Sequence, residues 1–200
     1  QLYKTISSLP NLKVYINVFK LNIQFMSFYQ KISVIGSKYI GLPKLMRWGF
    51  NLSPMYRRST ARITSVSPDL LNVQIKLPIS YKNRNYMGTI FGGSMFSAVD
   101  PIPMVQLINL LGHQYVVWDK SAQISFKRPG NVDLYAEFTY TKEELEQIIE
   151  QVERQNEIEI VKTTQLTNKS KTIVYCEVKK TIYIAGKAYY KMKRKEKARL

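Results

Sequence analysis

The sequence predicts an α+β fold in which an antiparallel sheet of about six strands wraps around one central helix, with a helical N-terminal extension. Two observations support this expectation. Short segments with alternating apolar and polar residues recur after residue 60, and turn-forming residues separate them. One long apolar stretch, residues 93–111, opens with paired glycines and has the length of a helix.

The predicted elements follow the turn signals in chain order. The expected strands cover residues 60–66, 71–77, 115–126, 132–140, 157–166 and 172–184. Residues 80–89 form a polar loop that leads into the glycine pair, and residues 93–111 form the apolar central helix. Thr141 to Glu144 has the pattern of a capping box and begins a short acidic helix.

The N-terminal extension has its own helical pattern. Apolar residues recur at steps of four and three between Val14 and Ile35, and a second apolar set leaves only a narrow polar stripe. Such a helix must be buried on more than one side, against the domain, a partner or a membrane surface. Lys20, Asn22 and Gln24 interrupt the roughly 20 apolar residues that a membrane span requires.

Positive charge is concentrated at the two ends of the chain. The net charge is +16, and no acidic residue precedes Asp69. Residues 187–200 contain many lysines and arginines but only one acid, Glu196. Such ends attract phosphate, anionic lipid or an acidic protein surface. The sequence therefore divides into a basic helical extension (1–44), one domain (45–186) and a basic C-terminal tail (187–200).

Two single residues limit the chemistry. Cys176 is the only cysteine, so an intrachain disulfide and a cysteine-rich metal site are excluded, and its alternation with Val174 and Val178 predicts a buried strand position. His113 is the only histidine and follows a glycine at a predicted helix end, where a capping role is expected. We therefore expect no metal site and no serine–histidine triad.

The glycine pair and a following aspartate form a candidate site. Gly92 and Gly93 open the apolar helix, where free backbone amides and the helix dipole favour a developing negative charge. Asp100 lies two turns further along and is a candidate base. Two alternatives stay open: a tight turn into a core helix, and an N-cap role for Asp100, because Pro101 and Pro103 break the helix there.

These residues belong to a wider pattern. Asn85, Gly88, Gly92–Gly93 and Asp100, followed by residues 121–130, resemble the hotdog-fold acyl-CoA thioesterases of the phenylacetic-acid-pathway type. The chain is more similar to a thioesterase-like hotdog family of unassigned reaction, through residues 91–94, 100–101 and 115–120. The resemblance covers residues 45–184 and implies the hotdog fold. Many such thioesterases carry histidine where this chain has Phe91, so a histidine contact to substrate is missing.

The resemblance also implies roles for individual residues. The catalytic set would be Asp100 as general base, the Gly93 amide as oxyanion donor and Asn85 as the group that orients water or the thioester. The acyl-CoA substrate, with coenzyme A as its only cofactor-like part, would contact Gly92, Phe91, Ser94, Lys127 and Arg128. Plain structural roles compete with these: loop stabilisation for Asn85, a helix-start hydroxyl for Ser94, and a solvated strand end for Lys127 and Arg128.

The spacing of the site favours a dimer. Gly93 and Asp100 share a helix face but stand about 10 Å apart along the axis. In hotdog dimers the central helices lie antiparallel, which would bring Asp100 of one chain to Gly93 of the other. A homodimer or a hotdog-like partner is therefore expected, with the site shared between two chains.

Three functions fit these features. The first is an acyl-CoA thioesterase. The second is a non-catalytic accessory subunit of a larger membrane or ribonucleoprotein complex, attached through the N-terminal helix and the basic tail. Its expected location is the mitochondrial matrix side, because the acid-free start at Gln1 resembles the surroundings of a presequence, or otherwise the cytoplasm. The third, nucleic-acid binding, rests on charge without a recognition motif and is expected only if the assembly contains RNA.

Overall fold

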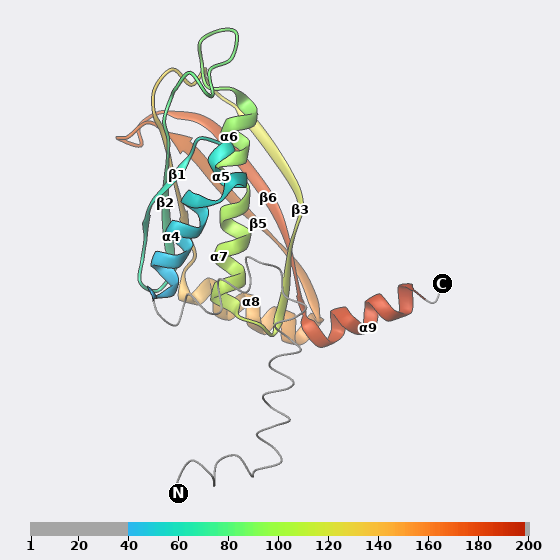
Figure 1. Ribbon diagram of the computed structural model, residues 1–200. Helices are drawn as coiled ribbons and strands as arrows, with labels where there is room; N and C mark the ends of the chain where they lie inside the picture. The colour runs from blue at the N-terminus through green and yellow to red at the C-terminus, as the bar shows by residue number, and fades with distance from the viewer. Residues whose placement is uncertain (1–39, 199–200) are drawn as a thin grey trace, which may run out of the picture. The chain divides into compact units, whose positions relative to one another are not determined.

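The structure is a computed structural model that describes residues 40–198 (Figure 1). The chain divides into two units, residues 1–45 and 46–200, and the second contains the sheet. The helix predicted between residues 14 and 35 lies outside the described residues. The described helices are α4 (Leu42–Leu52), α5 (Pro54–Arg58), α6 (Gly92–Val99), α7 (Pro101–Leu111), α8 (Lys142–Gln155) and α9 (Lys187–Lys197).

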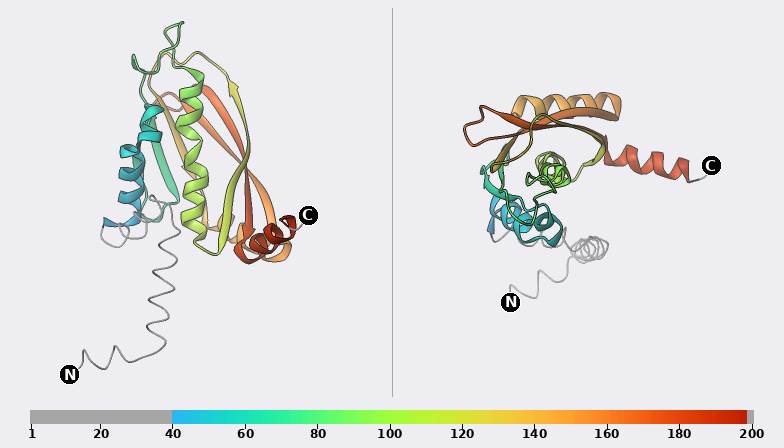
Figure 2. Two further views of the ribbon diagram at one scale, coloured as in Figure 1. Left: turned by 45° about the vertical axis from the view of Figure 1, so that its right-hand side comes forward. Right: turned by 90° about the horizontal axis from the view of Figure 1, so that it is seen from above.

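The strands form one antiparallel six-stranded sheet. They are β1 (Arg62–Val66), β2 (Asn72–Leu77), β3 (Tyr115–Phe126), β4 (Leu134–Thr139), β5 (Glu157–Thr167) and β6 (Val174–Gly186), in the spatial order β1-β2-β4-β5-β6-β3. The sheet curves around α6 and α7, which run along its inner face (Figure 2). The predicted α+β architecture, a sheet wrapped around a central helix, is confirmed.

The core lies between the central helices and the inner face of the sheet. Ile102 and Leu107 of α7 are fully buried, as are Ile182 and Ile184 of β6. Residues 92–111 are long and apolar enough to cross a membrane by length and composition. Part of that apolar surface packs on the sheet, and each fully buried aliphatic side chain contributes about 1.5–3 kcal/mol to folding.

The central helix is interrupted at Asp100, as the two prolines predict. α6 ends at Val99 and α7 begins at Pro101. Pro101 and Pro103 have no N–H to donate to the preceding turn, so the hydrogen-bond ladder of a continuous helix cannot form across this point. The interruption places Asp100 at a junction where its side chain and its carbonyl can both be reached from the sheet.

The capping box before α8 forms only in part. The Thr141 hydroxyl accepts a hydrogen bond from the Glu144 amide at 3.1 Å, as predicted. The Glu144 carboxylate binds Lys162 at 2.9 Å instead of turning back to the start of the helix. The apolar side of α8 is buried through Ile148 and Val152.

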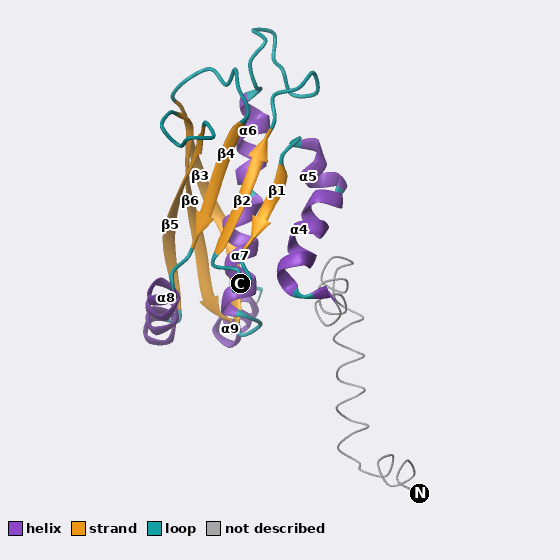
Figure 3. Ribbon diagram, turned by 90° about the vertical axis from the view of Figure 1, so that its left-hand side faces the viewer, coloured by secondary structure: helices purple, strands orange, loops and turns teal. Residues whose placement is uncertain are grey.

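The sheet consists of two halves with a seam between them. β4 pairs with β5 at only one position, Tyr135 with Thr167, whereas β2–β4 and β5–β6 pair along their lengths. β1, β2 and β4 form one group of strands and β3, β5 and β6 the other (Figure 3). We call the line between β4 and β5 the sheet seam.

Two exposed features belong to the β3–β6 pair: the edge strand β3 and the helix that follows β6. β3 is an edge strand of 12 residues, and its Trp118 and Phe126 side chains are exposed. The basic tail, for which the sequence predicted no structure, forms helix α9 without a buried residue. Lys193 of α9 binds the Glu157 carboxylate at 2.5 and 2.6 Å, which holds the helix to the start of β5.

Cys176 is buried in β6, as its alternation predicted. Burial raises the pKa of its thiol to about 11, so the thiolate needed for nucleophilic or redox chemistry is scarce near neutral pH.

Candidate functional site

A groove lies at the start of α6, and we call it the glycine groove. It has a volume of about 580 Å³ and is bounded by the loop before α6, the first turn of the helix and the turn after β3. Its lining includes four residues that the sequence proposed: Asn85, Gly92, Lys127 and Arg128. The other lining residues are Met87, Thr89, Ile90, Met95, Phe126, Pro129 and Gly130.

Two phenylalanine rings explain why both glycines are needed. A Cβ at Gly92 would lie 2.6 Å from the ring of Phe126, and a Cβ at Gly93 would clash with the ring of Phe91. Neither glycine has a positive φ, so the requirement comes from the close approach of the rings and not from an unusual backbone. The position of the missing histidine thus carries an aromatic side chain that covers the helix start.

The first backbone amides of α6 are available donors. The amides of Ser94 and Met95 both donate to the Phe91 carbonyl, at 2.9 and 3.2 Å. The amides of Gly92 and Gly93 have no acceptor among residues 40–198. Because the N-terminal end of a helix carries partial positive charge, these two N–H groups can stabilise an anion or an oxyanion.

Asn85 holds its own loop together. Its side-chain oxygen accepts from the Met87 and Thr89 amides at 3.0 and 3.1 Å, and its Nδ2 donates to the Thr89 hydroxyl at 3.0 Å. These contacts shape the wall of the glycine groove around Gly88, whose φ is 74°. They are the contacts expected of a loop-stabilising residue.

Lys127 and Arg128 follow directly from the end of β3. Both of their amides donate to the Tyr175 carbonyl, at 2.8 and 3.1 Å, which fixes the turn. Their side chains are exposed and line the glycine groove. Phe91 and Ser94 lie at the helix start beside the groove but are not part of its lining.

Asp100 lies in a separate charged cluster together with Lys180 and Asp119. The Lys180 ammonium lies 2.8 Å from Oδ1 of Asp100 and 2.6 Å from Oδ2 of Asp119. It also donates to the Asp100 carbonyl at 2.5 Å. Asp100 occupies the N-cap position of α7, but its side chain makes no capping hydrogen bond. The predicted capping contact is therefore wrong, because Lys180 takes the carboxylate instead.

The sequence reading missed Lys180 and Asp119 as site residues. Lys180 lies in the inward row of β6 between Val178 and Ile182, and only 2% of its surface is exposed. The sequence signal for Lys180 is a lysine at a position where the alternating pattern of β6 otherwise places buried apolar residues. Asp119 belongs to the 115–120 segment that carried the family resemblance, without a role attached to it.

The cluster retains contact with solvent through its carboxylates. The side chain of Asp100 is 41% exposed and that of Asp119 is 27% exposed. Burial raises the pKa of Asp119; the Lys180 hydrogen bond and charge oppose this rise, and the Asp100 charge adds to it. Asp119 therefore takes up a proton more readily than an aspartate in water.

The glycine groove and the charged cluster are distinct within one chain. Seven residues of helix separate Gly93 from Asp100, a rise of about 10 Å. The structure brings Asn85, Gly92, Lys127 and Arg128 together in the groove, and it places Asp100 outside this set.

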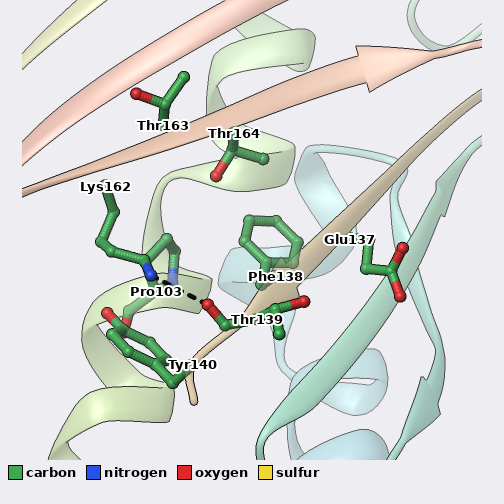
Figure 4. A pocket seen from close by; sticks show the side chains of 8 residues that line it. All are labelled: Pro103, Glu137, Phe138, Thr139, Tyr140, Lys162, Thr163 and Thr164. Atoms are coloured by element: carbon green, nitrogen blue, oxygen red, sulfur yellow. Dashed lines mark hydrogen bonds between the residues drawn. The ribbon is translucent and has the colours of Figure 1, made fainter. Parts of the chain in front are cut away.

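A second pocket of about 240 Å³ opens at the sheet seam (Figure 4). Its lining includes Pro103, Tyr140 and Lys162. The Lys162 ammonium donates to the Thr139 carbonyl at 2.9 Å and lies 4.1 Å from the centre of the Tyr140 ring. With Glu144 as its ion-pair partner, this lysine closes the seam and is not free to bind a ligand.

No cluster of three or more histidine, cysteine, aspartate or glutamate side chains suited to a metal occurs within residues 40–198. The charged cluster itself contains a buried ammonium where a cation would have to bind.

Known proteins resemble this chain chiefly in fold. No curated protein matches its sequence. A Pseudomonas aeruginosa protein of unknown function, described as a probable thioesterase, matches with a TM-score of 0.63 at 20% identity, over 72% of this chain and 95% of its own. A Haemophilus influenzae thioesterase matches with a TM-score of 0.52 at 11% identity, over 72% and 90%.

Zebrafish thioesterase superfamily member 2 matches with a TM-score of 0.50 at 16% identity, over 72% of this chain and 95% of its own. At these identities the likeness establishes the fold, which is the hotdog fold of thioesterase-superfamily proteins. The sequence model of one family matches residues 43–184, most of the chain. The chain therefore belongs to the family described as domain of unknown function DUF4442.

Proposed function

We propose that this protein hydrolyses acyl thioesters of coenzyme A at a site completed by a second copy of the chain. The observation that carries this proposal is the glycine groove, where Gly92, with its free helix-start amide, lines one cavity together with Lys127 and Arg128; the free amide of Gly93 follows it directly in the chain. The amides suit a thioester carbonyl, and the cations suit the phosphates of coenzyme A. The thioesterase names of the fold relatives support the same class of substrate.

The reaction follows from these groups. The thioester carbonyl accepts hydrogen bonds from the Gly92 and Gly93 amides, and Asp100 of the second copy takes a proton from the attacking water. The new C–O bond forms as negative charge collects on the carbonyl oxygen near the amides. The C–S bond then breaks, and the thiolate leaves with the proton from Asp100, giving the free acid and coenzyme A.

The exposed edge of β3 supports a two-chain site. A strand of 12 residues with one unpaired side offers backbone donors and acceptors for a neighbouring strand. Trp118 adds exposed apolar surface on the same strand. A second copy paired there would lie next to the open carboxylate oxygens of the charged cluster.

The decisive test is release of free thiol from a panel of acyl-CoA substrates by the wild-type chain and by Asp100→Asn. A general base contributes about 10²- to 10⁴-fold, so the variant should lose that much in kcat. Lys179→Met is the matched control, because Lys179 is an exposed neighbour of Lys180 on β6. A wild-type chain that turns over no thioester, or an Asp100→Asn variant with full activity, rules out the proposed reaction.

The coenzyme A contacts are tested with two classes of substrate. Lys127→Ala/Arg128→Ala should raise KM for acyl-CoA about tenfold or more, since two charge-assisted contacts to phosphate are lost. The same variant should leave KM unchanged for an acyl N-acetylcysteamine thioester, which has no phosphate. Equal losses for both substrates would mean that the two cations shape the turn and do not bind phosphate.

A second function, that of an accessory subunit, is favoured by helix α9. This helix exposes a basic surface and buries none of its residues. Its cations are Lys187, Lys191, Lys193, Arg194, Lys195 and Lys197. We propose an acidic partner surface for α9, tested by deleting residues 187–200 and measuring the size of the native complex on gel filtration at low salt. A small dimer with or without the deletion would rule out this role.

A further inference from the structure

We infer that Lys180 is a positioning residue shared between Asp100 and Asp119, and that this sharing holds the Asp100 carboxylate in place and couples its charge to Asp119. The inference rests on the proposed function, because it gives Asp100 its role as base. It extends that function to two residues for which neither the family match nor the fold relatives supply a role.

The cost of burying Lys180 argues for a role beyond packing. An ammonium group withdrawn from water carries a desolvation penalty that an apolar residue in the same row would avoid. Its neighbours in the inward row, Val178 and Ile182, are apolar and almost fully buried. A methionine or leucine would continue that row, so stability alone does not explain the lysine.

The hydrogen bonds of Lys180 define what it can do. An ammonium has three donors, and the Asp100 carbonyl, the Asp100 carboxylate and the Asp119 carboxylate supply three acceptors. No donor remains for a substrate, which excludes Lys180 itself as a substrate-binding group. Lys180 binds Oδ1 of Asp100 and Oδ2 of Asp119. Oδ2 of Asp100 and Oδ1 of Asp119 remain available to water.

Sharing the ammonium affects how strongly Asp119 binds a proton. A carboxylate paired alone with a buried cation binds protons weakly and is a poor base. A second carboxylate on the same lysine offsets part of that effect, because each aspartate repels the negative charge of the other. Lys180 therefore holds the Asp100 carboxylate in place, while the Asp100 charge makes Asp119 hold a proton more tightly.

The surrounding charges are already engaged in other pairs. Lys162 of β5 lies directly opposite Lys180 in the register, but its ammonium binds Glu144 of α8 and lies over the Tyr140 ring. Lys120, next to Asp119 on β3, pairs with Glu159 of β5. The charge balance around Asp100 is thus set mainly by Lys180 and Asp119.

The test follows proton uptake by Asp119 with carbon-13 NMR of its labelled carboxyl group in the full chain. Lys180→Met should move the titration midpoint of Asp119 upward by about one pH unit or more, because the nearby positive charge is removed. Asp100→Asn should move it downward, because a nearby negative charge is removed. Lys179→Met should leave it unchanged.

Activity supplies the second measurement. In Lys180→Met, kcat should fall while KM stays within about twofold, because the base loses the group that holds it in place but the substrate contacts are kept. If Lys180→Met does not fold, Asp100→Asn still tests the sharing, because it keeps the lysine. Identical Asp119 titrations in the wild type and in Asp100→Asn would overturn the inference. A wild type without turnover would refute the proposed reaction alone, since the NMR titrations need no substrate.

Discussion

The glycine groove and the charged cluster are built in opposite ways, although one broken helix contributes to both. One wall of the groove, the loop and the helix start, is organised by short-range contacts: Asn85 bonds to residues two and four positions away, and the Phe91 ring covers Gly93. In the cluster, Asp100 and Lys180 are 80 residues apart and meet only when β6 packs under the helix junction. This wall of the groove can form from its own segment of chain and needs the sheet only for the opposite wall after β3, whereas the cluster depends throughout on the register of the sheet.

The largest effect is expected when the cluster loses its lysine. Lys180→Ala leaves two carboxylates without their counter-ion, and breaking a buried pair costs about 3–5 kcal/mol. We expect about 3 kcal/mol, the lower end, because both carboxylates keep contact with water. Urea unfolding measures the loss, with Lys179→Ala as control. Equal stability of the two variants would show that the cluster is not coupled to the folded sheet.

A smaller effect is expected at the start of the helix. Gly93→Ala forces its new methyl group against the Phe91 ring, and overpacking of this kind costs about 1–3 kcal/mol. We expect about 1 kcal/mol, because the Phe91 side chain is 57% exposed and can turn away. The Phe91→Ala background should remove most of the cost in a double-mutant cycle. An undiminished cost there would place the strain elsewhere.

Asn85→Ala should have a still smaller effect on global stability. The loop is exposed and opens locally, so we expect a loss of about 0.5 kcal/mol, the low end for a net hydrogen bond. The amides of Met87 and Thr89 should nevertheless exchange hydrogen faster, because their acceptor is gone. A large fall in kcat with unchanged exchange would instead support the role of Asn85 in orienting water.

The smallest expected effect is a change in how steeply the free energy of unfolding depends on pH. Because the pKa of Asp119 is raised by burial, the folded protein holds this proton more tightly than the unfolded chain. The stability of the wild type relative to Asp119→Asn should therefore fall as pH rises from the pKa of Asp119 in the unfolded chain through its higher pKa in the folded protein. Urea titrations between about pH 3 and pH 7 would measure it over the ordinary range of aspartate.

Asp133 provides the control of opposite sign. The Lys76 hydrogen bond lowers the pKa of Asp133 in the folded protein. The stabilising contribution of Asp133 is therefore present above its pKa in the unfolded chain and is lost as pH falls through its lower pKa in the folded protein. The stability of the wild type relative to Asp133→Asn should rise with pH over the same range. If both variants changed the slope in the same direction, the assignment of Asp119 as the more readily protonated group would be wrong.

The sequence predicted the order of elements because its signals are local. The turn residues and the alternating patterns mark all six strands, and β3 begins and ends where expected. The break at Asp100 was predictable from Pro101 and Pro103, because a proline has no backbone N–H to donate within a helix. The helical state of the tail was missed, because a run of lysines gives no apolar periodicity to read.

The candidate site was predictable only in part, because Gly93, Phe91 and Ser94 are not in the groove lining and Asp100 lies in the charged cluster. Asn85, Gly92, Lys127 and Arg128 line one groove, as their shared motif implied. The partner of Asp100 was not predictable, because it depends on which residue of β6 faces the helix junction. The register of β3 against β6 also shifts between Asp119, which pairs with Ile182, and Ser121, which pairs with Thr181, so a simple alternating count does not reveal this contact.

Along the sheet seam the domain can open while the hydrogen bonds within β1-β2-β4 and within β5-β6-β3 stay intact. In the backbone ladder only the Tyr135–Thr167 pair joins β4 to β5, while helix α8 carries the chain from one strand to the other. Backbone amides on the facing sides of β4 and β5 should therefore lose hydrogen-exchange protection before those between β5 and β6. Partial unfolding would separate two three-stranded units that each keep their internal pairing.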